Sequence, residues 1–532
     1  MKKFISVMLA AIMVFALSAP AAAVSETQAD YPTIYIRGAK ATKIYNADGS
    51  LAIKPDSTDI GAYIEAEAGP VLEDFGKAVA TGEYSQWIDS LAATMGYLYD
   101  EWTINGDGEP ANGSYTKADQ LNANVAKKTN NFGATDYVFE YDWRLNLMET
   151  ADKLDEYIER VLEVTGAKKV NIFARCLGTQ PAMAYLYESY NGEYGHDFRV
   201  ANVAFDTPST LGYITLGALL SNSISLNPDS IDKFVSYFLE NKGLFENSEM
   251  NDLAAVFVSI FNQLQVLGFG TDVIAKVLED CGDELISKLA LACYGGYPAY
   301  YSMVSDKYYD KAINTVFYTD ELQAEYSGFI EDTREYHYAL NSVNEETGLT
   351  GAEQLLLDLQ KKGVNTAVFA KYGSMQFPLF EGCEITGDMR GTATELSLGA
   401  VAAKIDEKLP EEYLAAAEAN GTAKYISPDR QIDASTCLFP DTTWFIKNIA
   451  HDNFPASVNA IALEFFRSNG TVTVWSSEAD HTQYMDYSTG TLTELVVKNP
   501  DNEDNTWASD WMEILRNFIK SILDFFKNLF TF

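Results

Sequence analysis

One cysteine lies between a strand-like run and a helical pattern, in the segment "KVNIFARCLGTQPAMAYL". The β-branched and aromatic run ends at Ala174 and Arg175, Cys176 follows, and an apolar helical pattern begins after Gly178. This order predicts a tight turn that holds the thiol at the positive N-terminal end of a helix. Such a position, with a cation such as Arg175 nearby, lowers a cysteine pKa from about 8.5 toward neutrality. We therefore predict that Cys176 is a nucleophile; the alternative is a small residue at a tight turn with no chemistry.

A thiol nucleophile needs a histidine that exchanges protons with it and an acid that orients the histidine. The chain has four histidines, His196, His337, His451 and His481. His451 follows the strand-like run "TTWFIKNIA" and precedes a helical pattern, whereas His481 follows the weaker run "GTVTVWSS". We predict His451 as the partner of Cys176 and keep His481 as the second choice.

The orienting acid is expected between the nucleophile and the histidine in sequence. The loop "YISPDRQIDAST" offers Asp429, directly after a Ser-Pro turn, and Asp433. We rank Asp429 first and Asp433 second, although either aspartate also fits an ordinary surface turn.

Two backbone N–H groups are expected to stabilise the oxyanion that forms during acyl transfer. One belongs to Leu177, the residue after the nucleophile. The other is predicted at Ala39 or Lys40, in the loop after the strand at 33–37, because Gly38 lets that loop approach closely.

Short strand-like runs alternate with helical patterns, which predicts an α/β fold with a mostly parallel sheet covered by helices on both faces. Between residues 208 and 362 the alternation stops and apolar helical patterns dominate, which predicts a helical cap inserted between strands. The expected strands are 33–37, 136–141, 169–173, 199–205, 365–373, 442–449 and 470–477.

The two ends of the chain carry signals of their own. Residues 1–23 hold two lysines, an apolar stretch and an Ala-x-Ala ending, which predicts an export signal and a secreted mature chain. The pattern at residues 507–530 predicts a helix with one apolar face, which either packs on the domain or makes a peripheral contact with a membrane or cell surface. The predicted division is a signal peptide (1–23), the first part of the core (24–207), the cap (208–362), the second part of the core (363–467) and a C-terminal extension (468–532).

Charge and cysteine content limit the partners. The 38 basic and 76 acidic residues give a net charge of -38, which disfavours nucleic acid as a partner. The five cysteines are an odd number, so at least one thiol has no partner within the chain. By position, Cys281 with Cys293 and Cys383 with Cys437 are the natural pairs if disulfides form. We expect no metal ion and no cofactor.

The strand–turn–helix around Cys176 resembles the nucleophile elbow of α/β-hydrolases. The chain as a whole resembles their lecithin:cholesterol acyltransferase-like branch, through the segments "PTIYIRG", "YDWR" (141–144), "KVNIFARCLGT" and "SPDRQID". That resemblance implies an α/β-hydrolase fold and acyl-ester chemistry on lipids, with Cys176, Asp429 and His451 in the triad positions. The chain departs from the family in its cysteine for serine, in Ala174 for a glycine, and in Asp-Arg where the family has a Gly-Asp-Gly-x-Val acid loop.

Two functions follow from these features. The first is an exported acyl-ester hydrolase or acyltransferase, similar to a lipase or esterase, that acts on an apolar acyl substrate beneath the cap. The second is a catalytically silent α/β-hydrolase scaffold that binds a ligand or a surface.

Overall fold

The computed structural model describes residues 31–52, 54, 71, 73–126, 137–225, 227–241, 271–476 and 481–496. The predicted signal peptide and the amphipathic helix at 507–530 lie outside these residues. The chain divides into two compact units, Met1–Glu494 and Leu495–Phe532, and all elements described below belong to the first. Among the described helices, none has both the length and the apolar character needed to cross a membrane.

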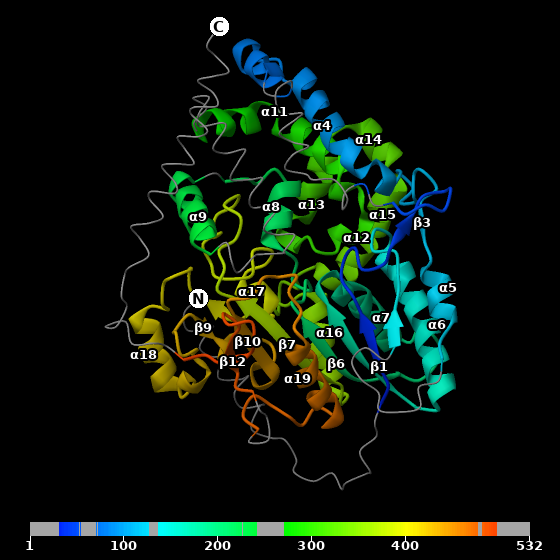
Figure 1. Ribbon diagram of the computed structural model, residues 1–532, viewed down its shortest axis with the longest axis vertical. Helices are drawn as coiled ribbons and strands as arrows, with labels where there is room; N and C mark the ends of the chain where they lie inside the picture. Colours follow the sequence, from blue (N-terminus) through cyan, green and yellow to red (C-terminus); the bar gives the residue numbers. More distant parts are fainter. Residues whose placement is uncertain are drawn as a thin grey trace. The chain divides into compact units, whose positions relative to one another are not determined.

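An eight-stranded sheet in the order β12-β11-β10-β7-β6-β5-β1-β4 forms the core (Figure 1). All neighbouring pairs are parallel except β11 with β12. The α/β class predicted from the alternating pattern is therefore confirmed. The strands are β1 (Thr33–Ile36), β4 (Tyr137–Phe139), β5 (Val170–Arg175), β6 (Val200–Asp206), β7 (Asn365–Tyr372), β10 (Thr443–Lys447), β11 (Tyr484–Asp486) and β12 (Thr493–Glu494).

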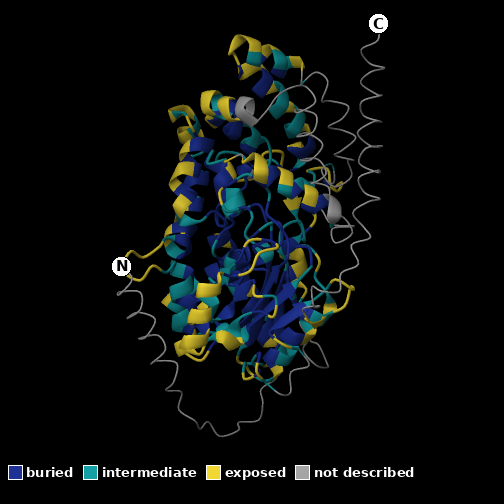
Figure 2. Cartoon of the chain, turned by 90° about the vertical axis from the view of Figure 1, so that its left-hand side faces the viewer, coloured by how far each residue is buried: buried dark blue, intermediate teal, exposed yellow. Residues whose placement is uncertain are grey.

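Helices cover both faces of this sheet, as the complete burial of β5 and β6 requires (Figure 2). On one face, α19 (Ala456–Arg467) packs its apolar side on aromatic side chains of the strands, including Phe369 and Trp444. On the other face lie α6 (Leu147–Thr165), α7 (Thr179–Asn191) and α16 (Gly351–Lys361), which pack on one another and on β4, β5 and β7.

A helical cap is formed by the segment between β6 and α16, through a core of aromatic and aliphatic residues. Two features differ from the predicted division. Helix α4 (Ser85–Tyr99), from the first part of the chain, packs on α11 of the cap through Trp87, Ile88 and Leu285, and α16 belongs to the sheet layers. The cap helices are α8 (Ile214–Leu220), α9 (Pro228–Glu240), α11 (Thr271–Ala292), α12 (Pro298–Tyr301), α13 (Asp306–Val316), α14 (Asp320–Glu325) and α15 (Ser327–Tyr336).

Two further expectations need correction. The run at 470–477 is not a strand over its described residues 470–476, and the strand that extends the sheet here is β11, which lies after His481. The disulfide pairs suggested by position are not formed, because all five cysteines are free thiols.

A chain of asparagines, buried in β5 and β6 and half-buried in β7, links these three strands near their amino ends. The Asn202 amide donates to Oδ1 of Asn171 and accepts from Nδ2 of Asn365, both at 2.8 Å. Asn202 is fully buried, so these amides satisfy one another where water cannot. The ladder fixes the register of three central strands at the edge opposite the candidate site.

Replacing Asn202 by alanine should lower the free energy of unfolding by about 1–3 kcal/mol, because it removes the donor to Oδ1 of Asn171 and one acceptor of Nδ2 of Asn365. Urea denaturation measures this change. Asn420→Ala, at the exposed end of α18 (Glu411–Asn420), is the matched control and should have little effect. Equal effects of the two substitutions would show that the ladder contributes nothing specific.

Candidate active site

Cys176 lies at a strained turn directly after β5. Its backbone φ is +48°, in the left-handed region that residues other than glycine rarely adopt. A Cβ placed on Gly178 would lie 2.5 Å from the carbonyl oxygen of Arg37 and 2.6 Å from that of Ile36, so only glycine fits beside the end of β1. The predicted strand–turn–helix geometry is thus present, and the thiol is partly exposed.

His451 contacts this thiol from a loop between β10 and α19. Its Nε2 lies 3.1 Å from Sγ of Cys176, across 275 residues of sequence. Because β5 and β10 run parallel, both side chains are carried to the same edge of the sheet, where the strands end. The imidazole is almost fully buried, and of the two histidines considered it is His451 that meets Cys176.

Asp388 completes the arrangement. Its Oδ2 accepts a hydrogen bond from Nδ1 of His451 at 2.6 Å, and its Oδ1 accepts from the backbone N–H groups of Arg390 and Gly391 at 3.1 and 3.0 Å. The carboxylate is fully buried, and it lies in the loop that follows β7. Both oxygens are therefore held, and the imidazole is fixed with its Nε2 toward the sulfur.

Neither predicted acid contacts His451. The Oδ2 atom of Asp429 accepts from Nζ of Lys447 at 2.8 Å and from the hydroxyl of Tyr372 at 3.2 Å. Asp433 accepts from the hydroxyl of Tyr413 at 2.8 Å. The physical reason is strand order, because β7 lies beside β10 and the loop after β7 therefore reaches the histidine.

The sequence did contain a signal for Asp388. The segment "TGDMRGT" contains the Gly-Asp pair that the resemblance implies for an acid loop, and it follows the correctly predicted strand β7. The second-choice histidine, His481, precedes β11 instead of following a strand.

Opposing effects set the pKa values of these three groups. Burial raises the pKa of Cys176, but the charge and hydrogen bond of His451, the Arg390 guanidinium and the Leu177 N–H together hold it below its usual value. Burial lowers the pKa of His451, but the charges of Asp388 and of the Cys176 thiolate raise it. Burial raises the pKa of Asp388, but His451 and the Gly391 N–H hold it below its usual value. The site thus favours a thiolate beside an imidazolium.

Arg175 is not the cation that acts on the thiol. Its Nε lies 3.1 Å from Oδ2 of Asp206, and its guanidinium stacks on Phe454 with 4.6 Å to the ring centre. Arg390, two residues after Asp388, supplies the positive charge that favours the thiolate instead. The expected electrostatic effect is present, but its source differs from the sequence prediction.

The loop after β1 lies against the nucleophile. A Cβ on Gly38 would be 3.0 Å from Cβ and 3.5 Å from Sγ of Cys176. The segment 141–144 anchors this loop at both ends, because the Tyr141 hydroxyl donates to the carbonyl of Arg37 at 2.9 Å and the Trp143 indole donates to that of Thr42 at 3.2 Å. Ala39 and Lys40 lie between these anchors, and Leu177 already directs its N–H to the sulfur.

The first residues of the cap cover the other side of the site. The Tyr213 ring packs edge-on against His451 with 6.0 Å between ring centres, and its hydroxyl donates to the carbonyl oxygen of Thr207 at 3.4 Å. The next backbone N–H, of Ile214, donates to Oε1 of buried Glu395 at 2.6 Å. Cap and acid loop are therefore tied together beside the thiol.

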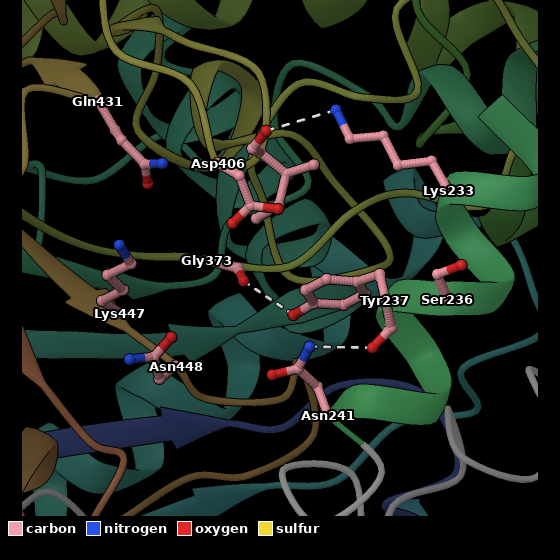
Figure 3. A pocket seen from close by; sticks show the side chains of 10 residues that line it. Lys233, Ser236, Tyr237, Asn241, Gly373, Asp406, Gln431, Lys447 and Asn448 are labelled. Atoms are coloured by element: carbon pink, nitrogen blue, oxygen red, sulfur yellow. Dashed lines mark hydrogen bonds between the residues drawn. The ribbon is translucent and has the colours of Figure 1, made fainter. Parts of the chain in front are cut away.

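A polar cavity of about 410 Å³ lies at the same edge of the sheet, beyond the ends of β7 and β10 (Figure 3). Lys233 and Tyr237 of α9 line it from the cap, and Gln431 and Lys447 line it from the core. Lys447 is the ion-pair partner of Asp429, so the acid predicted for the triad is bound to a residue of the cavity wall. In the described part of the chain, no cluster of side chains could hold a metal ion.

Comparisons with known proteins add little. No family profile and no curated protein matches the chain. A chain from the crystal structure of the Tle4-Tli4 complex aligns with 36% of this chain and 48% of its own length, at 17% identity and a TM-score of 0.18. The chain thus spans about half the length of that protein, and a likeness this weak carries no argument about function.

Cys176 should react with iodoacetamide at pH 6–7 before the other four thiols. Burial raises the pKa of Cys281 to about 11 and those of Cys293 and Cys437 to about 12, and it also raises that of Cys383. Peptide mapping after a short pulse identifies the labelled cysteine. In His451→Gln the midpoint of the alkylation–pH profile should rise to about 8.5 or above, because burial remains and the imidazolium is lost.

His481→Gln is the matched control and should leave that profile unchanged. An unchanged profile in His451→Gln, or first labelling at another cysteine, would contradict the assignment.

Proposed function

We propose that the chain is a thiol-dependent acyl-ester hydrolase or acyltransferase with an α/β-hydrolase fold, of the lecithin:cholesterol acyltransferase-like branch. The observation that carries the proposal is the continuous contact from Cys176 Sγ through His451 to Asp388. Support also comes from the order nucleophile, acid, histidine along the chain, which is the order of that fold.

In the first half-reaction the Cys176 thiolate attacks the carbonyl carbon of the ester. The negative charge that develops on the carbonyl oxygen is stabilised by the N–H of Leu177 and by one from the loop holding Ala39 and Lys40. The His451 imidazolium then gives its Nε2 proton to the leaving alcohol as the C–O bond breaks. The products are a thioester on Cys176, a free alcohol and a neutral imidazole.

In the second half-reaction water or an alcohol attacks the thioester. Neutral His451 takes the proton of the attacking hydroxyl, and Asp388 stabilises the imidazolium that forms. Collapse of the tetrahedral intermediate breaks the C–S bond and releases an acid or a new ester. The Cys176 thiolate beside protonated His451 is restored.

An apolar acyl group is the favoured substrate because the cap's hydrophobic core reaches the loops of the site. Met389 and Ala450, the neighbours of Asp388 and His451, belong to the same buried cluster as Tyr301 and Phe329 of the cap. Such surroundings exclude water from the thioester and favour hydrocarbon over polar acyl chains. The signal-like residues 1–23 support export as part of this proposal, and contact of residues 507–530 with a membrane or cell surface remains a prediction.

Purified protein should hydrolyse p-nitrophenyl esters, with a preference for longer acyl chains. Cys176→Ala should abolish turnover, and Cys176→Ser should lower kcat by about 10²-fold or more, because a hydroxyl is not ionised here as the thiol is. Absorbance of released p-nitrophenolate measures the rate. If neither the parent protein nor the serine variant turned over ester, the second function, a silent scaffold that binds a ligand or a surface, would be favoured.

Asp388→Asn should lower kcat by about 10²–10⁴-fold, because an amide neither fixes the imidazole tautomer nor stabilises the imidazolium. Asp429→Asn is the matched control and should keep the parent kcat per folded molecule, since Asp429 pairs with Lys447. The reverse ranking of these two variants would restore Asp429 as the orienting acid.

A further inference from the structure

The loop that carries His451 is neither helix nor strand, yet its imidazole must be held to within fractions of an ångström. Residues 448–455 connect β10 to α19 without regular hydrogen bonding. Directly beneath this loop lies the side chain of Lys371, near the end of β7 and with no exposed surface. Its Nζ donates to the carbonyl oxygens of His451 at 2.6 Å, Asn453 at 2.8 Å and Ala450 at 3.3 Å.

We propose that Lys371 is a positioning residue that holds the histidine loop, and through it the His451 imidazole, against Cys176. The inference rests on the proposed function, since it assigns Lys371 a part in the same site. Lys371 does not touch the reacting atoms and is not itself a catalytic residue.

The three contacts account for the charge state of Lys371. An ammonium group has three N–H donors, and the loop supplies three acceptors, whereas a neutral amine could donate only two. Burial, with the nearby Arg175 guanidinium, holds the pKa of Lys371 below its usual value, and the carboxylates of Asp206 and Asp388 oppose that effect. A buried cation whose donors are all used by one loop fixes the backbone of that loop strongly.

A second cation, Arg175, contacts the same loop. The ring of Phe454, three residues after His451, has Nζ of Lys371 4.2 Å from its centre and the guanidinium carbon of Arg175 at 4.6 Å. Arg175 is paired with Asp206 at the end of β6 and directly precedes the nucleophile. Lys371, Phe454 and Arg175 together therefore connect the strand before Cys176 with the loop that carries His451.

Two core side chains therefore hold His451 in different ways. The imidazole is oriented from one side by Asp388, while its backbone is held from below by Lys371. Loss of the ammonium would take the donor from the carbonyls of His451 and Asn453, whereas the Ala450 carbonyl would keep the N–H of Asn453. The loop would move to satisfy the carbonyls that lost their donor. A displacement of about 1 Å is enough to reduce a rate 10²-fold.

The test compares Lys371→Met, which keeps length and removes the charge, with Lys371→Gln, which keeps two N–H donors. Thr366→Val is the matched control, since Thr366 is buried in the same strand and its hydroxyl has no hydrogen-bond partner. The readouts are the iodoacetamide–pH profile of Cys176, kcat and KM for a p-nitrophenyl ester, and the urea midpoint.

In Lys371→Met the alkylation rate of Cys176 at pH 7 should fall by about tenfold or more, and the profile midpoint should rise toward about 8.5. The value of kcat should fall by about 10–100-fold with KM nearly unchanged. Lys371→Gln should lie between this variant and the parent, and Thr366→Val should match the parent. A merely structural role would lower the urea midpoint without moving the alkylation midpoint.

A folded Lys371→Met with the parent's alkylation profile overturns the inference. If that variant does not fold, the same result in Lys371→Gln overturns it. A parent profile without a lowered midpoint overturns it as well, since there is then no thiolate contact to hold. A fourth outcome separates the two proposals. If the parent shows no ester turnover but has a lowered alkylation midpoint, and Lys371→Met raises that midpoint, the proposed function is refuted and the inference stands.

Discussion

The contact between Cys176 Sγ and His451 Nε2 is the interaction on which the rest of the site depends. It joins two residues 275 positions apart and lies where two parallel strands end. A thiol in this position would be inert if burial acted alone, because burial disfavours the thiolate. The charge of His451, fixed in turn by Asp388, reverses that effect. The chemistry therefore follows from placing three ionisable groups in a row, two of them buried and the thiol at the partly exposed end.

The fold supplies this placement by fixing the backbone around the three groups. The turn at Cys176 requires a left-handed residue, and the close approach of β1 requires glycine at position 178. The 141–144 segment fixes the loop after β1, and Lys371 fixes the loop after β10. The cap adds Tyr213, whose ring packs on His451. Its hydrophobic core also includes Met389 of the acid loop and Ala450 of the histidine loop. Each constraint comes from a different part of the chain, and all meet at the carboxyl edge of the sheet.

The parts that sequence predicted well are those with local signals. The strand, turn and helix around Cys176 follow from residue types within about ten positions, and His451 follows from the scarcity of histidine and from the strand before it. Asp388 was missed because nearness in sequence to His451 favoured Asp429, whereas the sheet brings together loops after neighbouring strands β7 and β10. The predicted role of Arg175 is wrong because the sequence shows only that it adjoins Cys176. It does not show on which face of the sheet the Arg175 side chain lies. Similarly, the periodicity of α4 shows an apolar face but not that α11 covers it.

The central claim is that the Cys176 sulfur forms a covalent bond to an acyl group. Intact-protein mass spectrometry after acid quench of a brief incubation with p-nitrophenyl octanoate tests this directly. We expect one added octanoyl group, mapped to Cys176, removed by neutral hydroxylamine and absent from Cys176→Ala. The absence of any adduct under conditions where p-nitrophenolate is released, or an adduct on another residue, would contradict the account.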